Sequence, residues 1–313
     1  MALVIGEKET RELIDMPRAL KVVERIFHDR AAGKVRSLPR RRLRGSNKQL
    51  NVMAAWRADW DLLCLRAYAG VANTITLYNG RSGEVRLVLN AGYLSSLRTG
   101  AASGVAARYL APRKAEVIGL IGPGWQATFQ LEAIVRACRV RQVLVFGRSP
   151  KKRKHFIEQM RQALPVEPME SSSIEEVEER SDIVVLATDS TSPLIDGRRL
   201  KDEVLVITMG ANQPVKHEVS TDLIRRMDLL VTDDIPTAQN DSGDLLIACA
   251  SGIVRWEDVI PLERIVASAG PENHPKRILF QSNGIADEDL AVAHYILDQV
   301  QRKKIRLRRI PGI

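Results

Sequence analysis

The sequence predicts an α/β fold with a parallel sheet, and three observations favour this class. From residue 116 onward, short runs of Val, Ile and Leu alternate with helical segments. These runs do not alternate apolar with polar residues, which is typical of strands buried on both faces. Strand–helix alternation indicates parallel strands joined by right-handed crossovers. The length of 313 residues is enough for one large α/β domain or for two domains with separate cores.

The first hundred residues predict a helix followed by strands that are joined by tight turns. Asp15 can cap a helix, Pro17 fits its first turn, and Gly33 ends it. Between Leu50 and Asn90, apolar runs are separated by Asn-Gly and Ser-Gly pairs, which are typical of hairpin turns. The strands predicted in this part cover residues 62–65, 75–78 and 85–89.

The elements of the parallel region follow in order. A helix is predicted over residues 94–110, where the small residues between Gly100 and Gly104 indicate close packing against another backbone, and Pro112 stops it. Strands are predicted over residues 116–121, 143–146, 183–187, 204–208 and 229–232. Further helices are predicted between the glycine turn and residue 139, over residues 151–163, and from Asp287 onward.

The turn after the first predicted parallel strand carries a dinucleotide-binding pattern. Residues 122–127 read Gly-Pro-Gly-Trp-Gln-Ala, a G-x-G-x-x-A motif between a strand and a helix. Gly122 permits the tight turn, Gly124 lets a pyrophosphate approach the backbone, and the small Ala127 lets the helix pack on the strand. Free amides at the helix start hold the anion, which assigns Trp125 and Gln126 to the cofactor site. The motif therefore predicts a Rossmann-type domain.

The end of the second parallel strand favours NADP(H) over NAD(H). An NAD site usually has an Asp or Glu here, which binds the ribose 2′-hydroxyl. In this chain the strand is followed by Gly147, Arg148 and Ser149, with Lys152 close behind and no carboxylate. Arg148 and Ser149 can bind a 2′-phosphate, the arginine through charge-assisted hydrogen bonds. NADP(H) is the predicted cofactor and NAD(H) the alternative; Arg148 as a mere cap on a surface turn is the competing interpretation.

Composition excludes several other classes. Aromatic residues make up 4% of the chain, which argues against a stacking surface for single-stranded nucleic acid. Part of the net charge of +9 lies at residues 40–44 and 151–154, next to motifs, where we expect an anionic small ligand. No apolar run reaches the ~18 residues of a membrane helix, and no signal peptide is recognisable. The three cysteines form no C-x-x-C pair, so no metal site is expected, and the predicted location is the cytoplasm.

With these residues identified, the chain resembles the ornithine cyclodeaminase/μ-crystallin family from about Leu38 to Ala293. The most specific segment is Ser96–Leu110, which reads SLRTGAASGVAARYL and lies shortly before the glycine turn. Further matches to the family are residues 209–214, 242–245, 280–284 and 289–293.

The resemblance implies a domain arrangement, an assembly and a group of activities. A Rossmann domain over residues 114–289 is inserted into an α+β substrate-binding and dimerisation domain, formed by residues 1–113 plus 290–313. Members of the family are homodimers. Their activities include ornithine cyclodeamination, alanine dehydrogenation, reduction of cyclic ketimines and synthesis of N-substituted amino acids, and vertebrate relatives bind thyroid hormone.

The resemblance also implies which residues bind the ligands. Family sites hold the substrate carboxylate with two arginines and a lysine. Arg98 matches the helix arginine, and either Arg40 or Arg42 matches the upstream one. Cofactor-binding residues expected in addition to those of the glycine turn and the second strand are Thr99, Thr188, Met209, Ser282 and Asn283. For Thr188 a strand-end cap, and for Ser282 and Asn283 a plain helix-start turn, are the alternative interpretations.

Two positions depart from the family pattern. Arg66 stands where the family has a lysine, and Asn212 stands where the cyclodeaminases have their catalytic aspartate. Arg66 can bind a carboxylate but does not readily release a proton. Asn212 is neither an acid nor a base, but it can orient a substrate amine or the nicotinamide amide. We keep both as candidate catalytic residues.

The sequence therefore predicts an NADP(H)-dependent oxidoreductase. It would reduce an imine, either a cyclic ketimine or the product of a 2-oxo acid and an amine, to an amino acid, or catalyse the reverse reaction. Its expected partners are a small amino-acid or imino-acid substrate and a second copy of the chain, not nucleic acid or a membrane. Two alternatives stay open: an ornithine cyclodeaminase-type lyase, which Asn212 disfavours, and a non-catalytic ligand-binding protein of the μ-crystallin kind.

Overall fold

The computed structural model describes residues 2–305 and 307–310, and the chain forms two compact units. Unit 1 consists of residues 1–99 and 284–313, and unit 2 consists of residues 100–283. Unit 2 is thus an insertion in unit 1. Each helix formed by the described residues is too short or too polar to cross a bilayer.

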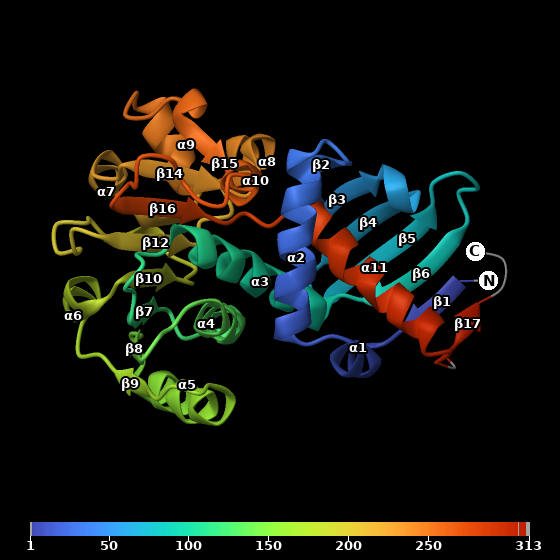
Figure 1. Cartoon of the computed structure of the whole chain (residues 1–313), viewed down its shortest axis with the longest axis horizontal. Helices are drawn as coiled ribbons and strands as arrows, with labels where there is room; N and C mark the ends of the chain where they lie inside the picture. Colours follow the sequence, from blue (N-terminus) through green and yellow to red (C-terminus); the bar gives the residue numbers. More distant parts are fainter. Residues whose placement is uncertain (1, 306, 311–313) are drawn as a thin grey trace. The chain divides into compact units, whose positions relative to one another are not determined.

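Unit 1 is a seven-stranded sheet with two long helices, α2 and α11, on one face (Figure 1). Its strand order is β17-β1-β6-β5-β4-β3-β2, in which only β1 and β6 are parallel neighbours. The strands are β1 (Ala2–Ile5), β2 (Val35–Arg44), β3 (Gln49–Arg57), β4 (Leu62–Ala69), β5 (Ala72–Asn79), β6 (Val85–Asn90) and β17 (Arg309–Ile310). The helices are α1 (Glu7–Leu13), α2 (Met16–Ala31), the first part of α3 (Gly92–Leu110) and α11 (Ala286–Arg302). Helix α2 begins as predicted, because the Asp15 side chain accepts a hydrogen bond from Arg18 N at 3.1 Å.

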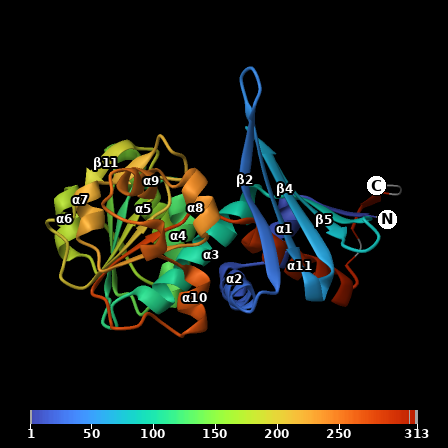
Figure 2. The ribbon, with the colours of Figure 1, turned by 90° about the horizontal axis from the view of Figure 1, so that it is seen from above.

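A register shift in the β2–β3 hairpin puts two predicted site residues on one face of this sheet. Leu38 pairs with Ala54 and Arg41 with Val52, so β2 accommodates one extra residue as a bulge. Arg40 is buried, and Arg42 pairs with the buried Asn51. Both arginines therefore belong to the covered face of the sheet. Figure 2 shows the hairpin extending beyond the other strands of the sheet.

Unit 2 is built on an eight-stranded sheet in which all neighbouring strands are parallel. Its order is β15-β14-β16-β12-β10-β7-β8-β9, with helices on both faces: Figure 2 shows α3 and α4 on one side, and α6 and α7 on the other. The strands are β7 (Val117–Ile121), β8 (Gln142–Phe146), β9 (Pro168–Glu170), β10 (Ile183–Leu186), β12 (Val204–Thr208), β14 (Leu229–Thr232), β15 (Val259–Pro261) and β16 (Arg277–Gln281). A small second sheet pairs β11 (Thr191–Ile195) with β13 (His217–Val219). The helices are α4 (Trp125–Ala137), α5 (Pro150–Ala163), α6 (Ile174–Arg180), α7 (Thr221–Arg225), α8 (Ile235–Asp241), α9 (Gly243–Ala250) and α10 (Leu262–Ala267).

The predicted fold class is confirmed. Each strand expected in the parallel region is present within a residue or so of its predicted bounds, and its residues are almost all buried. The strand order β9-β8-β7-β10-β12 is that of a doubly wound Rossmann sheet, in which the direction of progression reverses between β7 and β10.

The two units change over at residues 99/100 and 283/284, whereas the sequence suggested boundaries at 113/114 and 289/290. Packing explains the first difference, because a Cβ at Gly100 would lie 2.4 Å from the Phe129 carbonyl oxygen of α4. The second part of α3 is therefore attached to the Rossmann sheet. The start of α11 belongs to unit 1 because its acidic side chains pair with arginines of that unit.

Candidate active site

The glycine turn lies between β7 and α4, where the motif predicted it. Gly122 has a φ of 96°, in the left-handed region that favours glycine. A Cβ at this position would lie 2.6 Å from the Ala187 carbonyl oxygen, so the turn leaves no space for a side chain. At Gly124, the N-cap residue of α4, a Cβ would meet nothing within 4 Å. The backbone there faces open space, from which an anion can approach the amides of the helix start.

This turn lies at the switch point of the sheet. Ligands of open α/β sheets bind at the carboxyl ends of the strands where the progression reverses. Thr188 follows the neighbouring strand β10, and its Cγ2 lies 2.7 Å from the position that a Cβ of Gly122 would occupy. The fold thus brings Gly122 and Thr188 together at the expected place.

The end of β8 packs directly against the glycine turn. A Cβ at Gly147 would lie 2.5 Å from Pro123 Cδ, so only glycine permits this approach. Arg148 and Ser149 follow and are exposed. Ser149 is the N-cap of α5 and accepts a hydrogen bond from Lys152 N at 3.4 Å, so these three predicted residues are grouped at one helix start.

One carboxylate near this group is already neutralised. Glu170, at the end of the adjacent strand β9, forms an ion pair with Arg153. Arg153 also donates from Nη1 to the Gly147 carbonyl at 2.5 Å, which fixes the backbone before Arg148. The β8 end therefore presents positive charge on a fixed turn.

A single buried carboxylate, Glu218, anchors the loops that follow β10 and β12. It accepts hydrogen bonds from Thr188 N at 2.7 Å and Thr188 Oγ1 at 2.8 Å. Its other oxygen accepts from Met209 N at 3.1 Å and Gly210 N at 2.7 Å. Asp244 lies behind it and accepts from Glu218 N at 3.0 Å. Two predicted cofactor residues, Thr188 and Met209, are thus positioned by a residue that sequence analysis did not single out.

The Glu218–Asp244 pair binds protons more tightly than exposed carboxylates do. Burial raises the pKa of Glu218, against the hydrogen bonds donated to it. Burial and then the charge of Glu218 raise the pKa of Asp244 to about 8. The pair therefore keeps at least one proton near neutral pH.

Other predicted residues occupy the loops at the carboxyl edge. Asn212 donates from Nδ2 to the Met209 carbonyl at 3.1 Å, and Asn283 N donates to Asp233 at 2.7 Å. Among the described residues, Ser282 Oγ and Gln126 Oε1 are buried and have no hydrogen-bond partner. Buried polar atoms without a partner are rare in native proteins, and a bound ligand is one way to satisfy them.

In unit 1, the predicted substrate residues Arg66 and Arg98 meet around Asp289. Arg66 Nη1 and Arg98 Nε donate to the same oxygen, Asp289 Oδ1, at 2.8 and 3.0 Å. Arg98 Nη1 also donates to Glu288 at 2.8 Å, and Arg66 Nη2 donates to Ser95 Oγ at 2.7 Å. The two arginines are only 3% exposed, and both acids are completely buried.

Two more arginines reach the same helix start. Arg30 forms an ion pair with Asp287, and Arg40 Nη2 donates to the Gly284 carbonyl at 3.2 Å. We call this group the arginine–acid cluster; its members are Arg30, Arg40, Arg66, Arg98, Asp287, Glu288 and Asp289. Arg42 is half-buried on the same sheet face, and Thr99 Oγ1 donates to the Ser95 carbonyl within α3 at 2.8 Å.

Both central guanidinium groups stay charged. Burial lowers the pKa of Arg66, and the charge of Asp289 opposes this effect. Burial acts on Arg98 in the same direction, but Asp289 and Glu288 together outweigh it and raise the pKa of Arg98. Arg66 Nε and Asp289 Oδ2 are buried and lack a hydrogen-bond partner among the described residues. Arg66 Nε is thus a buried donor that an anionic ligand could satisfy, whereas Asp289 Oδ2 is an acceptor and requires a donor.

The acids of this cluster were not predicted as site residues. Asp287, Glu288 and Asp289 occupy the first turn of a helix, where acidic residues are common because they interact favourably with the helix dipole. Only their complete burial against arginines from distant parts of the chain distinguishes them. The unusual signal in the sequence is that three such acids directly precede an apolar helix stripe.

The model of the ornithine cyclodeaminase/mu-crystallin family matches residues 2–304. The chain belongs to this family. The resemblance predicted from residues 96–110 and from the glycine turn is thereby confirmed.

Three similar proteins illustrate the activities within the family. The iminosuccinate reductase of Paracoccus denitrificans is 28% identical over 97% of this chain and 98% of its own length. The structure of Thermococcus litoralis Δ1-pyrroline-2-carboxylate reductase in complex with NADH and L-proline has a TM-score of 0.92 and 26% identity, and covers 98% of this chain and 100% of that chain. An archaeal alanine dehydrogenase dimer with bound NAD has a TM-score of 0.91 and 27% identity over 99% of both chains.

These relatives agree with the prediction of an enzyme from the imine-reductase and amino-acid dehydrogenase group. The cofactors in the two structures are NADH and NAD. Neither is the NADP(H) that the β8 end of this chain predicts.

Proposed function

We propose that this chain is an NADP(H)-dependent oxidoreductase that reduces an imine to an amino acid, or catalyses the reverse dehydrogenation. One observation carries the proposal: the glycine turn lies at the switch point of a Rossmann sheet, beside a strand end that presents Arg148 and Ser149 instead of a carboxylate. The reductases and dehydrogenases among its relatives support the reaction class.

The residues of unit 2 fit a nicotinamide dinucleotide. Gly122 permits the tight turn, Gly124 leaves the space that a pyrophosphate needs, and the start of α4 supplies the donors, with Trp125 and Gln126 as its first residues. The buried, unpartnered oxygens of Gln126 and Ser282 are consistent with a ligand at this edge. Further residues of unit 2 that we assign to the cofactor are Thr188, Met209 and Asn283, and from unit 1 we assign Thr99. When bound, the cofactor supplies or accepts a hydride.

The preference for NADP(H) follows from charge. A 2′-phosphate carries between about one and a half and two negative charges at neutral pH. Arg148 can bind it in a bidentate manner, and Ser149 and Lys152 lie at the same helix start. The nearby Glu170 does not oppose binding, because Arg153 neutralises it.

The arginine–acid cluster is the proposed site for the substrate carboxylate. Its four arginines outnumber its three acids, and Arg42 on the same sheet face adds a further positive charge. Asp289 and Glu288 orient Arg98, and Asp289 orients Arg66. A carboxylate bound to these guanidinium groups would complete the hydrogen bonds that Arg66 Nε now lacks.

The limited ability of Arg66 and Asn212 to donate or accept protons favours imine reduction over cyclodeamination. Arg66 is a charge partner, not a proton donor, and Asn212 cannot exchange protons. A protonated imine already carries the proton of the product amine, so its reduction requires no strong acid from the protein. We assign to Asn212 the role of orienting an amine or an amide through hydrogen bonds.

Cofactor titration tests the first half of the proposal. Trp125 is 56% exposed at the glycine turn, so its fluorescence should respond to a bound dinucleotide. We expect NADPH to bind more tightly than NADH, and Arg148→Ala to remove most of this difference while leaving NADH binding unchanged. Trp125→Phe should abolish the signal and thereby assign it to the turn. Tighter binding of NADH to the wild type would contradict the cofactor assignment.

A turnover assay tests the second half. We expect NADPH oxidation with a cyclic ketimine carboxylate, or with a 2-oxo acid plus an amine, and loss of turnover in Arg98→Ala. The same substrates without a carboxylate should react poorly. Absence of oxidation with any of these substrates, together with intact NADPH binding, would refute the enzymatic assignment.

Two further parts of the proposal concern assembly and compartment. We infer a homodimer, supported by the dimeric relative and by exposed apolar residues of unit 1, namely Leu38, Leu43 and Leu63 on the sheet and Val71 in the turn between β4 and β5. Light scattering at micromolar concentration would test it, with a monomer as the contradicting result.

We also keep the cytoplasm as the compartment, supported by three cysteines that are unpaired thiols.

A further inference from the structure

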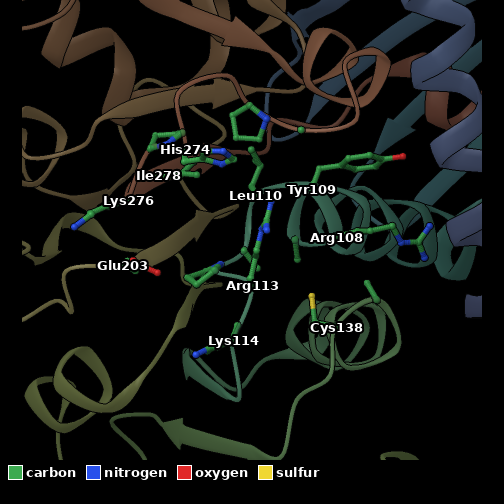
Figure 3. A pocket seen from close by; sticks show the side chains of 18 of the residues that line it. Arg108, Tyr109, Leu110, Arg113, Lys114, Cys138, Glu203, His274, Lys276 and Ile278 are labelled. Carbon is green, nitrogen blue, oxygen red and sulfur yellow. The ribbon is translucent and has the colours of Figure 1, made fainter.

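A cavity of unit 2 lies at the amino ends of the parallel strands, opposite to the glycine turn. It has a volume of about 1010 Å³ and is lined by the segment between α3 and β7, the end of α4 and the loop before β16 (Figure 3). Strands β7 and β16 begin beside it, and Glu203 precedes β12 there. Because these strands are parallel, the cavity is at their amino ends, whereas Gly122 follows a carboxyl end. The cavity is therefore separate from the proposed cofactor site.

The segments around this cavity are fixed by hydrogen bonds. Asp182 accepts from the amides of Glu116 and Val117, both at 2.9 Å, directly after the first lining segment. Asp228 accepts in the same way from the amides of Lys276 and Arg277 at 2.9 Å. Two separate carboxylates thus hold the strand starts that carry the lining loops. The cavity walls have defined positions, which favours ligand binding because little ordering is required.

The lining is strongly basic. It contains five cationic side chains and one carboxylate, that of Glu203; the cations are Arg108, Arg113, Lys114, Arg139 and Lys276. Figure 3 shows Arg113 between the end of α4, which carries Cys138, and the loop that carries His274 and Lys276. Within the described part of the chain, the side chains of Arg113, Lys114, Arg139 and Lys276 take part in no ion pair or hydrogen bond.

Two of these cations have an ordinary structural explanation. Arg108 lies in the last turn of α3 and Arg139 follows the end of α4, where positive charge interacts favourably with the helix dipole. The two helix ends together contribute about one negative charge, and Glu203 contributes another. Counting the lining side chains and these helix ends alone, about three positive charges remain uncompensated. They correspond to Arg113, Lys114 and Lys276, which lie in loops and therefore have no helix-capping role.

Size and lining indicate the class of ligand. Pockets for organic ligands usually measure about 300–1,000 Å³, so this cavity is much larger than a single inorganic ion requires. Apolar groups such as Pro112, Pro271 and Ile278 share the walls with the cations. The cations come from two loops, so several anionic groups of one molecule can be bound at the same time.

We propose that this cavity binds an organic polyanion of the size of a nucleoside triphosphate. Arg113, Lys114 and Lys276 hold its phosphate groups, and the apolar walls contact its organic part. The site is independent of the dinucleotide site, and it does not depend on the oxidoreductase assignment.

Calorimetric titration with ATP as the probe tests this proposal, using the whole protein saturated with NADPH. We expect one molecule of ATP to bind per chain with a Kd below about 1 mM, and more weakly as salt is added. Lys114→Glu combined with Lys276→Glu should weaken binding by about tenfold or more. Both residues are exposed, so the variant should fold normally, which circular dichroism would verify.

The matched control is Lys8→Glu combined with Lys21→Glu, which changes the net charge equally at exposed positions of unit 1. We expect this variant to bind ATP like the wild type. If both variants bound ATP equally weakly, the loss would come from the net charge of the protein and not from this cavity, which would overturn the proposal. Binding of ATP to the NADPH-free protein but not to the NADPH-saturated protein would also overturn it, because ATP would then occupy the dinucleotide site. Failure of NADPH to bind would concern only the proposed function, since the comparison of the two variants does not need it.

Three further probes test the ligand class. Inorganic triphosphate should bind more weakly than ATP, and adenosine should not bind measurably, because both charge and organic contacts contribute. Triphosphate binding as tight as that of ATP would refute the role of the apolar walls. A single-stranded oligonucleotide that binds far more tightly than ATP, and loses this affinity in the Lys114/Lys276 variant, would refute a small-molecule site.

Discussion

Arg98 Nε donates a hydrogen bond to Asp289 Oδ1 at 3.0 Å, and this contact joins the first part of α3 to the first turn of α11 within unit 1. The same oxygen accepts from Arg66 Nη1 at 2.8 Å. One buried carboxylate oxygen thus serves both guanidinium groups that we assign to the substrate.

Asp289→Asn should therefore be strongly destabilising. The variant leaves two buried arginines with less compensating charge, and breaking a buried ion pair typically costs about 3–5 kcal/mol. We expect a loss toward the lower end of this range, because Glu288 still pairs with Arg98. Urea unfolding followed by circular dichroism measures it.

The control for this variant is Glu132→Gln, which removes the partly exposed ion pair between Glu132 and Arg136. Such surface pairs contribute about 0–1 kcal/mol. If the two variants changed the free energy of unfolding equally, the arginine–acid cluster would have no special role in stability.

The two glycines of the turn should respond differently to alanine. Gly122→Ala places a methyl group against the Ala187 carbonyl at a φ of 96°, so we expect both a lower Tm and loss of NADPH binding. Gly124 has a φ of −103° and open space around its Cβ position. Gly124→Ala should keep the wild-type Tm and still weaken NADPH binding by about tenfold or more, because the methyl group occupies the path of the pyrophosphate. Unchanged NADPH affinity in Gly124→Ala would mean that no pyrophosphate approaches this turn.

The bulge in β2 separates the functions of three consecutive arginines. Arg40 and Arg42 belong to the covered face of the sheet, whereas Arg41 is exposed. We expect Arg40→Ala and Arg42→Ala each to raise the KM of the imine substrate by about tenfold, since each removes a charge that attracts the carboxylate. Arg41→Ala is the matched control and should leave KM unchanged. An equal rise in all three variants would indicate a general electrostatic effect.

The buried pair of Glu218 and Asp244 should make stability depend on pH. The pKa of Asp244 rises from 3.8 to about 8 in the folded protein, so folding favours its protonated form. Its stabilising contribution is complete below the ordinary pKa and is lost as the pH rises through about 8. Between pH 5 and pH 9 the wild type should lose free energy of unfolding, and Asp244→Asn should lose less. Asp222→Asn, at a partly exposed position, should follow the wild type. If Asp244→Asn lost as much free energy of unfolding as the wild type over this pH range, the titration would belong to other groups.

Five of the eight strands of the parallel sheet, and the glycine turn, could be predicted because their signals are local; β9, β15 and β16 were not predicted. Each of the five strands is a continuous apolar run, and the order of a strand, two spaced glycines and a helix allows few alternative structures. The hairpin strand β2 could not be predicted in this way. Its sequence, VRSLPRRRLR, contains a proline and no clear apolar–polar alternation. It forms a strand because β3 pairs with it, and Arg40 is held by the Gly284 carbonyl.

In the arginine–acid cluster, the arginines could be predicted from the sequence but their acidic partners could not. Arg66 and Arg98 stood out through their motifs, but their partners Glu288 and Asp289 lie about 190–220 residues away in sequence. The basic cavity has the same origin, since Lys114 and Lys276 become neighbours only through the order of the parallel strands. Residues brought together by topology leave no pattern within any one segment.

The insertion of unit 2 into unit 1 determines the order in which the nascent chain can fold. Unit 2 is contiguous in sequence, so it is complete once residue 283 has left the ribosome. At that stage strand β1 lacks its partner β17, and the arginines of unit 1 lack the acids of α11. The N-terminal sheet therefore keeps unneutralised arginines and an unpaired edge until the last helix and β17 are translated. During this interval the first hundred residues are the part of the nascent chain that most needs protection by chaperones.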